Sequence, residues 1–305
     1  PPTKLRSSLR AGAYQILYMR VPSHAAVSAT VSASSKKNKS IVNAILRRIS
    51  EEARINWPNE GTRLSYPEWI IELLIRDLGK KNAFEMLEKM NEAPSVSVRD
   101  DGYRQDLASQ WITDIIGVSK QDLLLDMCSA PGGKATALAT QARKVVACDI
   151  NESRHKLMHE NKTNLSLENL TQVVSDGRSA PFSSHVFDHI LVDAPCSGLG
   201  VLHRRADSRW RIEEGDVKNL AKLQIDLLDS SVRLLKDGGV LSYSVCTVTN
   251  QETVDVVKSL ENRHPNLIPE ELFHERWRKI GNGLQILPQD SGTDGMSIFQ
   301  WKLAF

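Results

Sequence analysis

The chain has 305 residues, of which 41% are hydrophobic and 25% charged, the proportions of an ordinary globular protein. That length is enough for a complete α/β catalytic domain and a smaller domain beside it. No stretch approaches the roughly 20 apolar residues that span a bilayer, which argues against a transmembrane role. The first residues, PPTKLRSSLR, lack the apolar core of a secretory signal, so we expect a cytoplasmic protein.

The net charge is only +2, but basic residues are concentrated near the N-terminus. The acidic residues of segment 1–57 are Glu51 and Glu52, and its basic residues are Lys4, Arg6, Arg10, Arg20, Lys36, Lys37, Lys39, Arg47, Arg48 and Arg54. Such an excess suits a polyanion such as RNA. A solvated basic helix surface is equally compatible with it, so charge alone leaves both interpretations open.

The chain has four cysteines, at positions 128, 148, 196 and 246. They form no CxxC pair and have no histidine at metal-ligand spacing, so we expect no metal site. A chain of this size needs no disulfides, and a reducing compartment would keep the thiols free. The role of each cysteine must therefore be judged from its surroundings.

Up to about residue 95 the chain reads as all helical. Apolar residues recur at helical spacing over 9–19 and 41–49, and segment 32–40 between them (SASSKKNKS) is typical of a flexible loop. A helix with Pro67 in its first turn is expected to end at Gly79. Another should cover residues 82–90.

From about residue 120, short apolar runs alternate with amphipathic stretches. Strands are predicted at 123–127, 145–149, 171–175, 189–194 and 239–245, with helices at 133–142, 151–165, 217–236 and 249–262. This alternation indicates an α/β fold with a doubly wound parallel sheet, preceded by a helical domain. The alternating segment 296–303 predicts an added antiparallel strand. Ligands bind such sheets at the carboxyl ends of the strands.

A glycine loop and two acidic residues follow the first three predicted strands. CSAPGGK (128–134) can turn sharply and approach a ligand, although it matches neither a phosphate loop nor a dinucleotide loop. Asp149 ends the second strand, where a carboxylate can accept hydrogen bonds from ribose hydroxyls. Asp176 follows the third and could contact an adenine amino group. Each acid alone could be a helix cap, but three such features at successive strand ends favour a nucleoside cofactor.

Two cysteines follow the fourth and fifth strands, in DAPCSGLG (193–200) and SYSVCTVTNQE (242–252). Adjacent strands would bring Cys196 and Cys246 to the same edge of the sheet. A thiolate that adds to carbon 6 of cytosine makes carbon 5 nucleophilic enough to accept a methyl group. A protonated Asp193 could stabilise the charge at ring N3, and a second thiol could assist release of the product.

The other two cysteines carry weaker signals. Cys148 lies within an apolar run and reads as a small buried hydrophobe. Cys128 begins the glycine loop, where packing is a simpler role than reaction.

At these residues the chain resembles the family of RNA cytosine-5 methyltransferases, which includes bacterial rRNA enzymes and eukaryotic Sun-type proteins. CSAPGGK is similar to that family's CAAPGGK loop, and DAPCSGLG matches its DAPCSGxG signature, whereas the usual TCS is here Val245-Cys246-Thr247. The resemblance implies S-adenosyl-L-methionine as cofactor, Cys246 as nucleophile and Cys196 as the residue that aids release. It implies these cofactor contacts: Cys128, Ser129, Ala130, Pro131, Gly132, Gly133, Lys134, Asp149, Asp176 and Asp193.

The N-terminal sequence is similar to the last helices of a NusB-like RNA-binding domain, which this family carries in a bacterial branch acting on 16S rRNA. We therefore expect a partial NusB-like domain at 1–57, a helical connection at 58–99 and a Rossmann-like methyltransferase domain at 100–305. The family normally has further NusB-like helices, and a small RNA-binding subdomain near residue 100. We expect that these residues are missing from the chain; a natural deletion is the alternative.

A cytosine within a duplex cannot present carbons 5 and 6, so the target must be single-stranded or extruded. Segment 203–211, HRRADSRWR, could grip the RNA backbone and stack on a base, or could be a helix that packs its Trp inward.

We expect a monomer with 16S rRNA as its partner. A tRNA substrate is the first alternative, and a non-catalytic ribosome-assembly factor is the second, although retention of both cysteines argues against it. A DNA cytosine methyltransferase fits poorly, because those enzymes use a nucleophile after the fourth strand alone.

Overall fold

The computed structural model describes residues 2–19, 21–51 and 56–304. Three residues of the N-terminal charge count, Arg20, Glu52 and Arg54, lie outside these ranges. The chain divides between Asn59 and Glu60 into two compact units. None of the described helices combines the length and apolar character needed to cross a membrane.

Three helices form the N-terminal unit: α1 (Thr3–Leu17), α2 (Ser23–Ala33) and α3 (Lys39–Glu51). Their buried core consists of Leu5, Val27, Val42 and Leu46. Gly12 permits a close crossing of α1 and α3, because a Cβ there would lie 2.4 Å from Cδ1 of Leu46. The helices predicted at 9–19 and 41–49 are therefore present, and the first begins earlier than its apolar pattern suggested.

The flexible loop predicted at 32–40 is wrong over most of its length. Helix α2 continues to Ala33, a 3₁₀ turn, η1, occupies Lys36–Asn38, and α3 begins at Lys39. The Ser34 hydroxyl donates to the carbonyl of Thr30 (2.8 Å), so this polar side chain is used at the end of a helix. Serine-rich composition alone does not distinguish such ends from loops.

Three short helices begin the second unit: α4 (Glu60–Leu64), α5 (Glu68–Leu78) and α6 (Lys80–Lys89). Pro67 stands at the N-cap of α5, one residue before the predicted first turn, and Gly79 ends the helix with a φ of 77°. The apolar face of these helices packs on loops of the catalytic sheet in one core, which includes Tyr66, Ile70, Leu74, Met86, Leu87, Leu199, Leu202, Val217, Val248 and Leu287.

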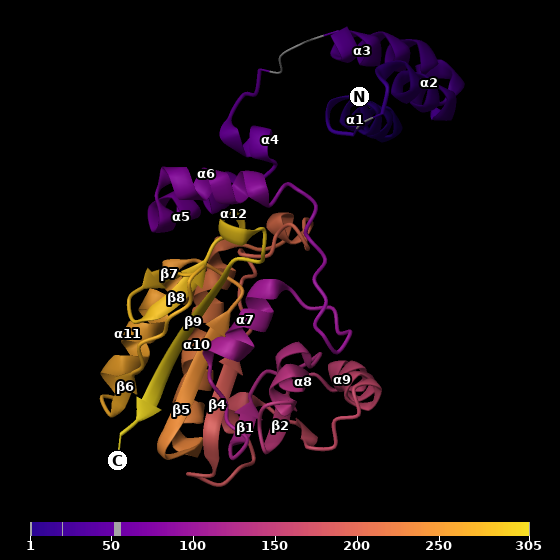
Figure 1. Ribbon diagram of the computed structural model, residues 1–305. Helices are drawn as coiled ribbons and strands as arrows, with labels where there is room; N and C mark the ends of the chain where they lie inside the picture. Colours follow the sequence, from indigo (N-terminus) through magenta and orange to yellow (C-terminus); the bar gives the residue numbers. More distant parts are fainter. Residues whose placement is uncertain (1, 20, 52–55, 305) are drawn as a thin grey trace. The chain divides into compact units, whose positions relative to one another are not determined.

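A single sheet forms the centre of this unit, with strand order β3-β2-β1-β4-β5-β9-β8-β7, and β6 also pairs with β9. The predicted parallel strands are β1 (Leu123–Asp126), β2 (Lys144–Asp149), β3 (Leu170–Val174), β4 (Phe187–Asp193) and β5 (Leu235–Val245). The predicted last strand, β9 (Met296–Leu303), runs antiparallel to β5 (Figure 1). The α/β fold class is therefore confirmed.

Helices cover both faces of the sheet, and strands β1, β2, β4 and β9 each supply residues to both cores (Figure 1). Neighbouring residues of β1 face opposite ways: Leu125 packs in the core beneath α10 (Glu214–Leu234) and α11 (Val254–Arg263). Leu124 packs in the core with residues of α7 (Leu107–Ile115), α8 (Gly133–Ala139) and α9 (Glu152–Asn164). Burial on both faces explains why these strands are continuous apolar runs in the sequence.

The C-terminal edge holds elements that the sequence analysis did not predict. They are β6 (Leu267–Pro269), β7 (Arg278–Ile280), β8 (Gly283–Ile286) and the one-turn helix α12 (Pro288–Ser291). Each has only three or four residues, too few to show a periodic pattern.

The segment near residue 100, where the family normally has a further subdomain, is a tight turn. Val98 pairs with Arg104 across it, and Gly102 adopts a φ of 86°. Arg99 donates from this turn to the carbonyl of Gly133 (2.7 Å) and to the Thr136 hydroxyl (3.1 Å). The turn therefore braces the first residues of α8.

Candidate active site

The carboxyl ends of β1, β2, β4 and β5 surround one cavity of about 600 Å³. Its lining includes predicted site residues from five separate segments: Cys128, Ala130, Asp149, Asp176, Asp193, Cys196 and Cys246. Parallel strands bring residues distant in the sequence to one edge, which is why these side chains meet here.

The glycine loop after β1 is held in place by the end of β2. Asp149 is 7% exposed and accepts hydrogen bonds from the backbone N–H of Ala130 (3.0 Å) and of Asn151 (2.8 Å). Gly132 has a φ of 103°, and a Cβ there would lie 2.8 Å from Cγ of Met158. Only glycine allows this turn, so the loop approaches the cavity through its backbone.

Ser129 and Pro131, within the loop, make hydrogen bonds that anchor it to neighbouring segments. The Ser129 hydroxyl donates to the carbonyl of Cys148 (3.0 Å), and the carbonyl of Pro131 accepts from the Asn161 amide (3.0 Å). Gly133 starts α8 beside them. These residues shape the loop and are absent from the lining of the cavity.

Buried Lys134 and half-buried Asp193 form an ion pair at the site. Lys134 Nζ donates to Asp193 Oδ2 (2.7 Å), and the Ser244 hydroxyl donates to Oδ1 (2.6 Å). The pKa of Lys134 is raised overall: burial alone would lower it, but the charge and hydrogen bond of Asp193 act in the opposite direction. Each oxygen of the Asp193 side chain therefore contacts one donor, and its role toward ring N3 stays a prediction.

Asp176 lies on the opposite side of the cavity and caps the 3₁₀ turn η2 (Gly177–Ser179). Its carboxylate accepts from the backbone and the guanidinium of Arg178, and these hydrogen bonds lower its pKa. The helix-cap role and the position at the cavity wall therefore both apply to this residue.

The two cysteine thiols meet at the ends of β4 and β5. The sulfur atoms of Cys196 and Cys246 are 3.1 Å apart, because β4 and β5 are adjacent parallel strands. The interaction with Cys246, followed by burial, raises the pKa of Cys196 well above its usual range. Either sulfur can donate the hydrogen bond of this pair, so the two thiols are coupled through one contact.

The remaining cysteines are poor nucleophiles in this structure. Burial raises the pKa of Cys128 well above its ordinary value and that of Cys148 to about 12. Cys148 is fully buried in a hydrophobic core, as predicted from its apolar run, whereas Cys128 reaches the cavity wall.

A buried glutamate joins the two cysteine loops, and the sequence analysis missed it. Glu252 is 0% exposed and accepts from Ser197 N–H (2.7 Å), Ser197 Oγ (2.5 Å), Thr249 Oγ1 (3.1 Å) and Gln224 Nε2 (3.1 Å). Since Ser197 follows Cys196 directly, the carboxylate fixes the backbone that carries this thiol. An acid six positions after Cys246 was the available signal, but nothing in the pattern marks it as buried.

Gln224 extends this network to the other side of Cys196. Its amide donates to the carbonyl of Pro195 (2.9 Å) and its oxygen accepts from the hydroxyl of Tyr243 (2.9 Å). The Ser197 hydroxyl lies 3.1 Å from that of Thr247, which follows Cys246. The residues on both sides of Cys196 are therefore tied to the strand end that carries Cys246.

The interpretation in which HRRADSRWR packs its tryptophan inward and keeps its arginines in solvent is wrong for Trp210 and Arg209, whereas RNA binding by this segment stays a prediction. Trp210 is 63% exposed, whereas Arg209 is 5% exposed and lies 3.9 Å from the centre of the Tyr66 ring. Arg204 pairs with Asp106 and Asp294. Only Arg205 of the four arginines lines the large cavity beside the thiols. Within the described residues, no group of three or more His, Cys, Asp or Glu side chains could hold a metal ion.

Comparison with known proteins gives two family matches. The model of the family described as 16S rRNA methyltransferase RsmB/F matches residues 114–302, and that of the NusB family matches residues 2–51. Two similar curated proteins are the ribosomal RNA small subunit methyltransferases B of Yersinia pseudotuberculosis (serotype O:1b, strain IP 31758) and Yersinia pestis (bv. Antiqua, strain Angola). Each is 28% identical over 342 residues, covering 93% of this chain and 79% of the relative. An alignment longer than the 305-residue chain requires gaps in this chain, so these relatives contain internal residues that it lacks.

Two solved structures from Pyrococcus horikoshii also resemble it. A methyltransferase homolog has a TM-score of 0.68 at 20% identity and covers 80% of this chain and 97% of its own, which supports the fold alone. NSun6, solved with SFG, has a TM-score of 0.61 at 28% identity and covers 67% of this chain and 53% of its own.

Proposed function

Because the chain belongs to the RsmB/F family of 16S rRNA methyltransferases, we propose that it methylates carbon 5 of a cytosine in 16S rRNA, using Cys246 as a covalent nucleophile. The observation that carries this proposal is the pair of thiols 3.1 Å apart at the wall of the strand-end cavity. A methyltransferase that needs no covalent step has no use for two cysteines in this position.

The strand-end cavity fits S-adenosyl-L-methionine, which supplies a methyl group bound to a positively charged sulfur. Three carboxylates, those of Asp149, Asp176 and Asp193, line the cavity and suit a cationic ligand. Asp149 at the end of β2 would bind the ribose hydroxyls, and Asp176 would lie near the adenine. The cavity volume of about 600 Å³ lies within the usual range for small-molecule and cofactor sites.

In the first step, the Cys246 thiolate forms a bond to carbon 6 of an extruded cytosine, and the ring electrons move toward N3. The Asp193–Lys134 pair lies at the same wall, and Lys134 Nζ is the proton donor that the pair offers. A proton passed through Asp193 to N3 would neutralise the developing charge. Asp193 then acts as a carrier of the proton between Lys134 and the ring.

Product release requires a base for the proton on carbon 5. Once Cys246 is a neutral thioether, its interaction with Cys196, the largest cause of the raised pKa of that thiol, is gone, although burial still raises the pKa. Cys196 would release its proton to solvent at this stage. Its thiolate then takes the carbon 5 proton, the bond between carbon 6 and sulfur breaks, and that electron pair returns to Cys246. As the ring becomes aromatic again, the proton on N3 returns through Asp193 to Lys134. One proton is then released per methyl transferred, and Lys134 and both thiols recover their initial states.

Mass-spectrometric mapping of 5-methylcytidine in unmodified 16S rRNA, incubated with protein and labelled cofactor, tests the proposal. We expect wild-type protein to modify one cytosine, Cys246→Ala to be inactive, and Cys196→Ala to accumulate an RNA adduct that persists on a denaturing gel. Cys148→Ala is the matched control, because this cysteine is buried outside the cavity and should be dispensable for activity.

Three outcomes would count against parts of the proposal. Near-normal turnover by Cys246→Ala refutes the nucleophile. Turnover without any adduct from Cys196→Ala refutes the release role. Labelling of tRNA in place of 16S rRNA refutes the substrate but leaves the chemistry intact.

A further inference from the structure

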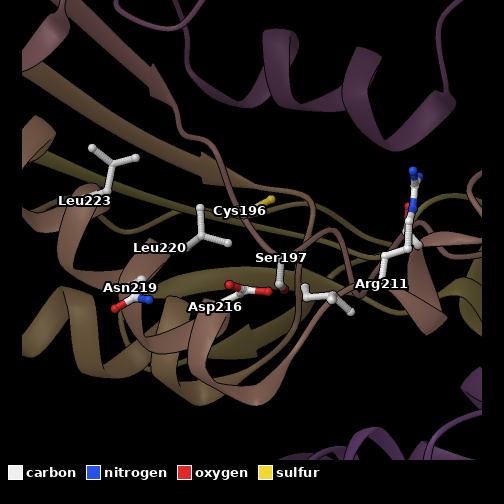
Figure 2. A pocket seen from close by; sticks show the side chains of 9 residues that line it. Cys196, Ser197, Arg211, Asp216, Asn219, Leu220 and Leu223 are labelled. Carbon is white, nitrogen blue, oxygen red and sulfur yellow. The ribbon is translucent and has the colours of Figure 1, made fainter.

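A second cavity, of about 480 Å³, opens beside Cys196 on the side of α10 (Figure 2). Four of its lining residues, Cys196, Ser197, Ser208 and Leu223, also line the reaction cavity. The two spaces are therefore neighbours that share a wall at the cysteine proposed to release the product. A molecule held in the reaction cavity by its ring can continue into this second space.

The walls of this second cavity combine apolar and polar side chains. Leu220 and Leu223 of α10 and Ile212 after η3 (Ser208–Trp210) supply half-buried aliphatic surface. Asp216 and Asn219 lie along α10 beside Leu220, and Arg211 extends on the other side (Figure 2). A flat base can pack on such aliphatic groups while its edge meets polar ones, which is how proteins read unstacked nucleotides.

The polar groups at the rim retain hydrogen-bonding capacity. The Asn219 amide has no hydrogen-bond partner among the described residues, so both its donor and its acceptor are available. Asp216 accepts the backbone N–H of Glu213 through Oδ2 (2.9 Å), which caps α10. An amide and a carboxylate one helical turn apart can pair with the donors and acceptors on the edge of a nucleobase.

We propose that this cavity binds the base of the nucleotide next to the target cytosine, with Leu220 and Leu223 packing on its face and Asn219 on its edge. The inference rests on the proposed function, because the neighbouring nucleotide enters only when the target is extruded beside Cys196. The first turns of α10 would then contribute to RNA binding and sequence preference. They would take no part in methyl transfer itself.

The experiment uses a short single-stranded RNA that contains the target cytosine, in three forms: intact, abasic on the 5′ side of the target and abasic on the 3′ side. The dissociation constant of each form is measured for the full chain carrying Cys246→Ala, which prevents covalent bonding. The same measurements are made after adding Leu220→Ala, Asn219→Ala or, as a control on the same helix outside the cavity, Ser230→Ala.

We expect one of the two abasic forms to bind roughly tenfold more weakly than intact RNA to the Cys246→Ala protein, since packing on a base contributes to affinity. Leu220→Ala and Asn219→Ala should reduce this difference, because the contact is already lost, whereas Ser230→Ala should preserve it. The inference is overturned if both abasic forms bind like intact RNA, or if the difference is the same in all variants.

The outcome for the proposed function is read separately. If wild-type protein leaves the intact RNA and full-length 16S rRNA unmethylated, the proposed function fails, while the binding differences still decide the role of the cavity. If no form of the RNA binds, both ideas are wrong. If methylation proceeds but the base beside the target has no effect on binding, only the second cavity is misassigned.

Discussion

Removing the buried carboxylate of Glu252 should disorganise the site without touching the cofactor cavity. Glu252 receives four hydrogen bonds, and two of them hold Ser197, the residue after Cys196. The residue itself is absent from the lining of the cavity. Its substitution therefore separates the positioning of a thiol from the binding of ligands.

The hydrogen bonds of Glu252 determine how much stability its substitution should cost. Glu252→Ala leaves the Ser197 N–H buried without an acceptor, whereas the hydroxyl of Ser197 can turn to Thr247. The unpaired donor and the cavity left by the side chain together should lower the free energy of unfolding by about 3–5 kcal/mol. Glu252→Gln keeps one acceptor oxygen at the site, so we expect a loss of about 1–2 kcal/mol.

Urea denaturation gives the free energies, and methyl transfer under saturating cofactor gives the rate. Glu252→Gln should remain folded and bind cofactor normally, yet turn over at least tenfold more slowly, because Cys196 no longer sits in a fixed position against Cys246. Glu275→Ala, a change at an exposed glutamate, is the control and should alter neither property. A Glu252→Gln protein with wild-type turnover would show that this network has no part in placing the thiols.

Two further results are expected. Asp149→Ala should weaken cofactor binding in calorimetry by tenfold or more, and unchanged affinity would remove this residue from the ribose site. Burial lowers the pKa of His189 to about 4, so the unfolded chain binds more protons than the native state between pH 6.5 and 4, and stability falls as the pH drops through that window. The loss should reach about 3 kcal/mol at most, and His189→Gln should reduce it; equal pH dependence in urea titrations of both proteins would contradict this assignment.

The parts of the fold that the sequence predicts are those with a strong local pattern. Strands β1, β2 and β4 contribute to the cores on both faces of the sheet, so they appear as apolar runs. The topology of a parallel sheet then places Asp149, Cys196 and Cys246 at one edge. Strands β6 to β8 could not be found this way because three or four residues carry too little periodicity.

The sequence could not predict the environments of side chains whose partners lie far away along the chain. Glu252 is buried by Ser197, 55 positions earlier, and nothing near it in the sequence indicates that carboxylate's environment. Arg209 stands in a polar, arginine-rich run that reads as solvated, and its burial follows from Tyr66 and Asn91 in another region. The partner of Asp193 is likewise distant in the sequence: it is Lys134, a residue identified only as part of the glycine loop.

The shared core of α4 to α6 and the cysteine loops has a practical consequence for dissecting the molecule. Leu199 and Val248 lie three and two residues from the reactive sulfurs, and both are buried against this helical segment. A fragment that starts at Glu60 keeps this support and should fold as a soluble unit. A fragment that starts at residue 100 lacks these helices and would expose the apolar residues that they cover, next to the two cysteine loops. We expect this fragment to aggregate, although it retains every residue assigned to the chemistry.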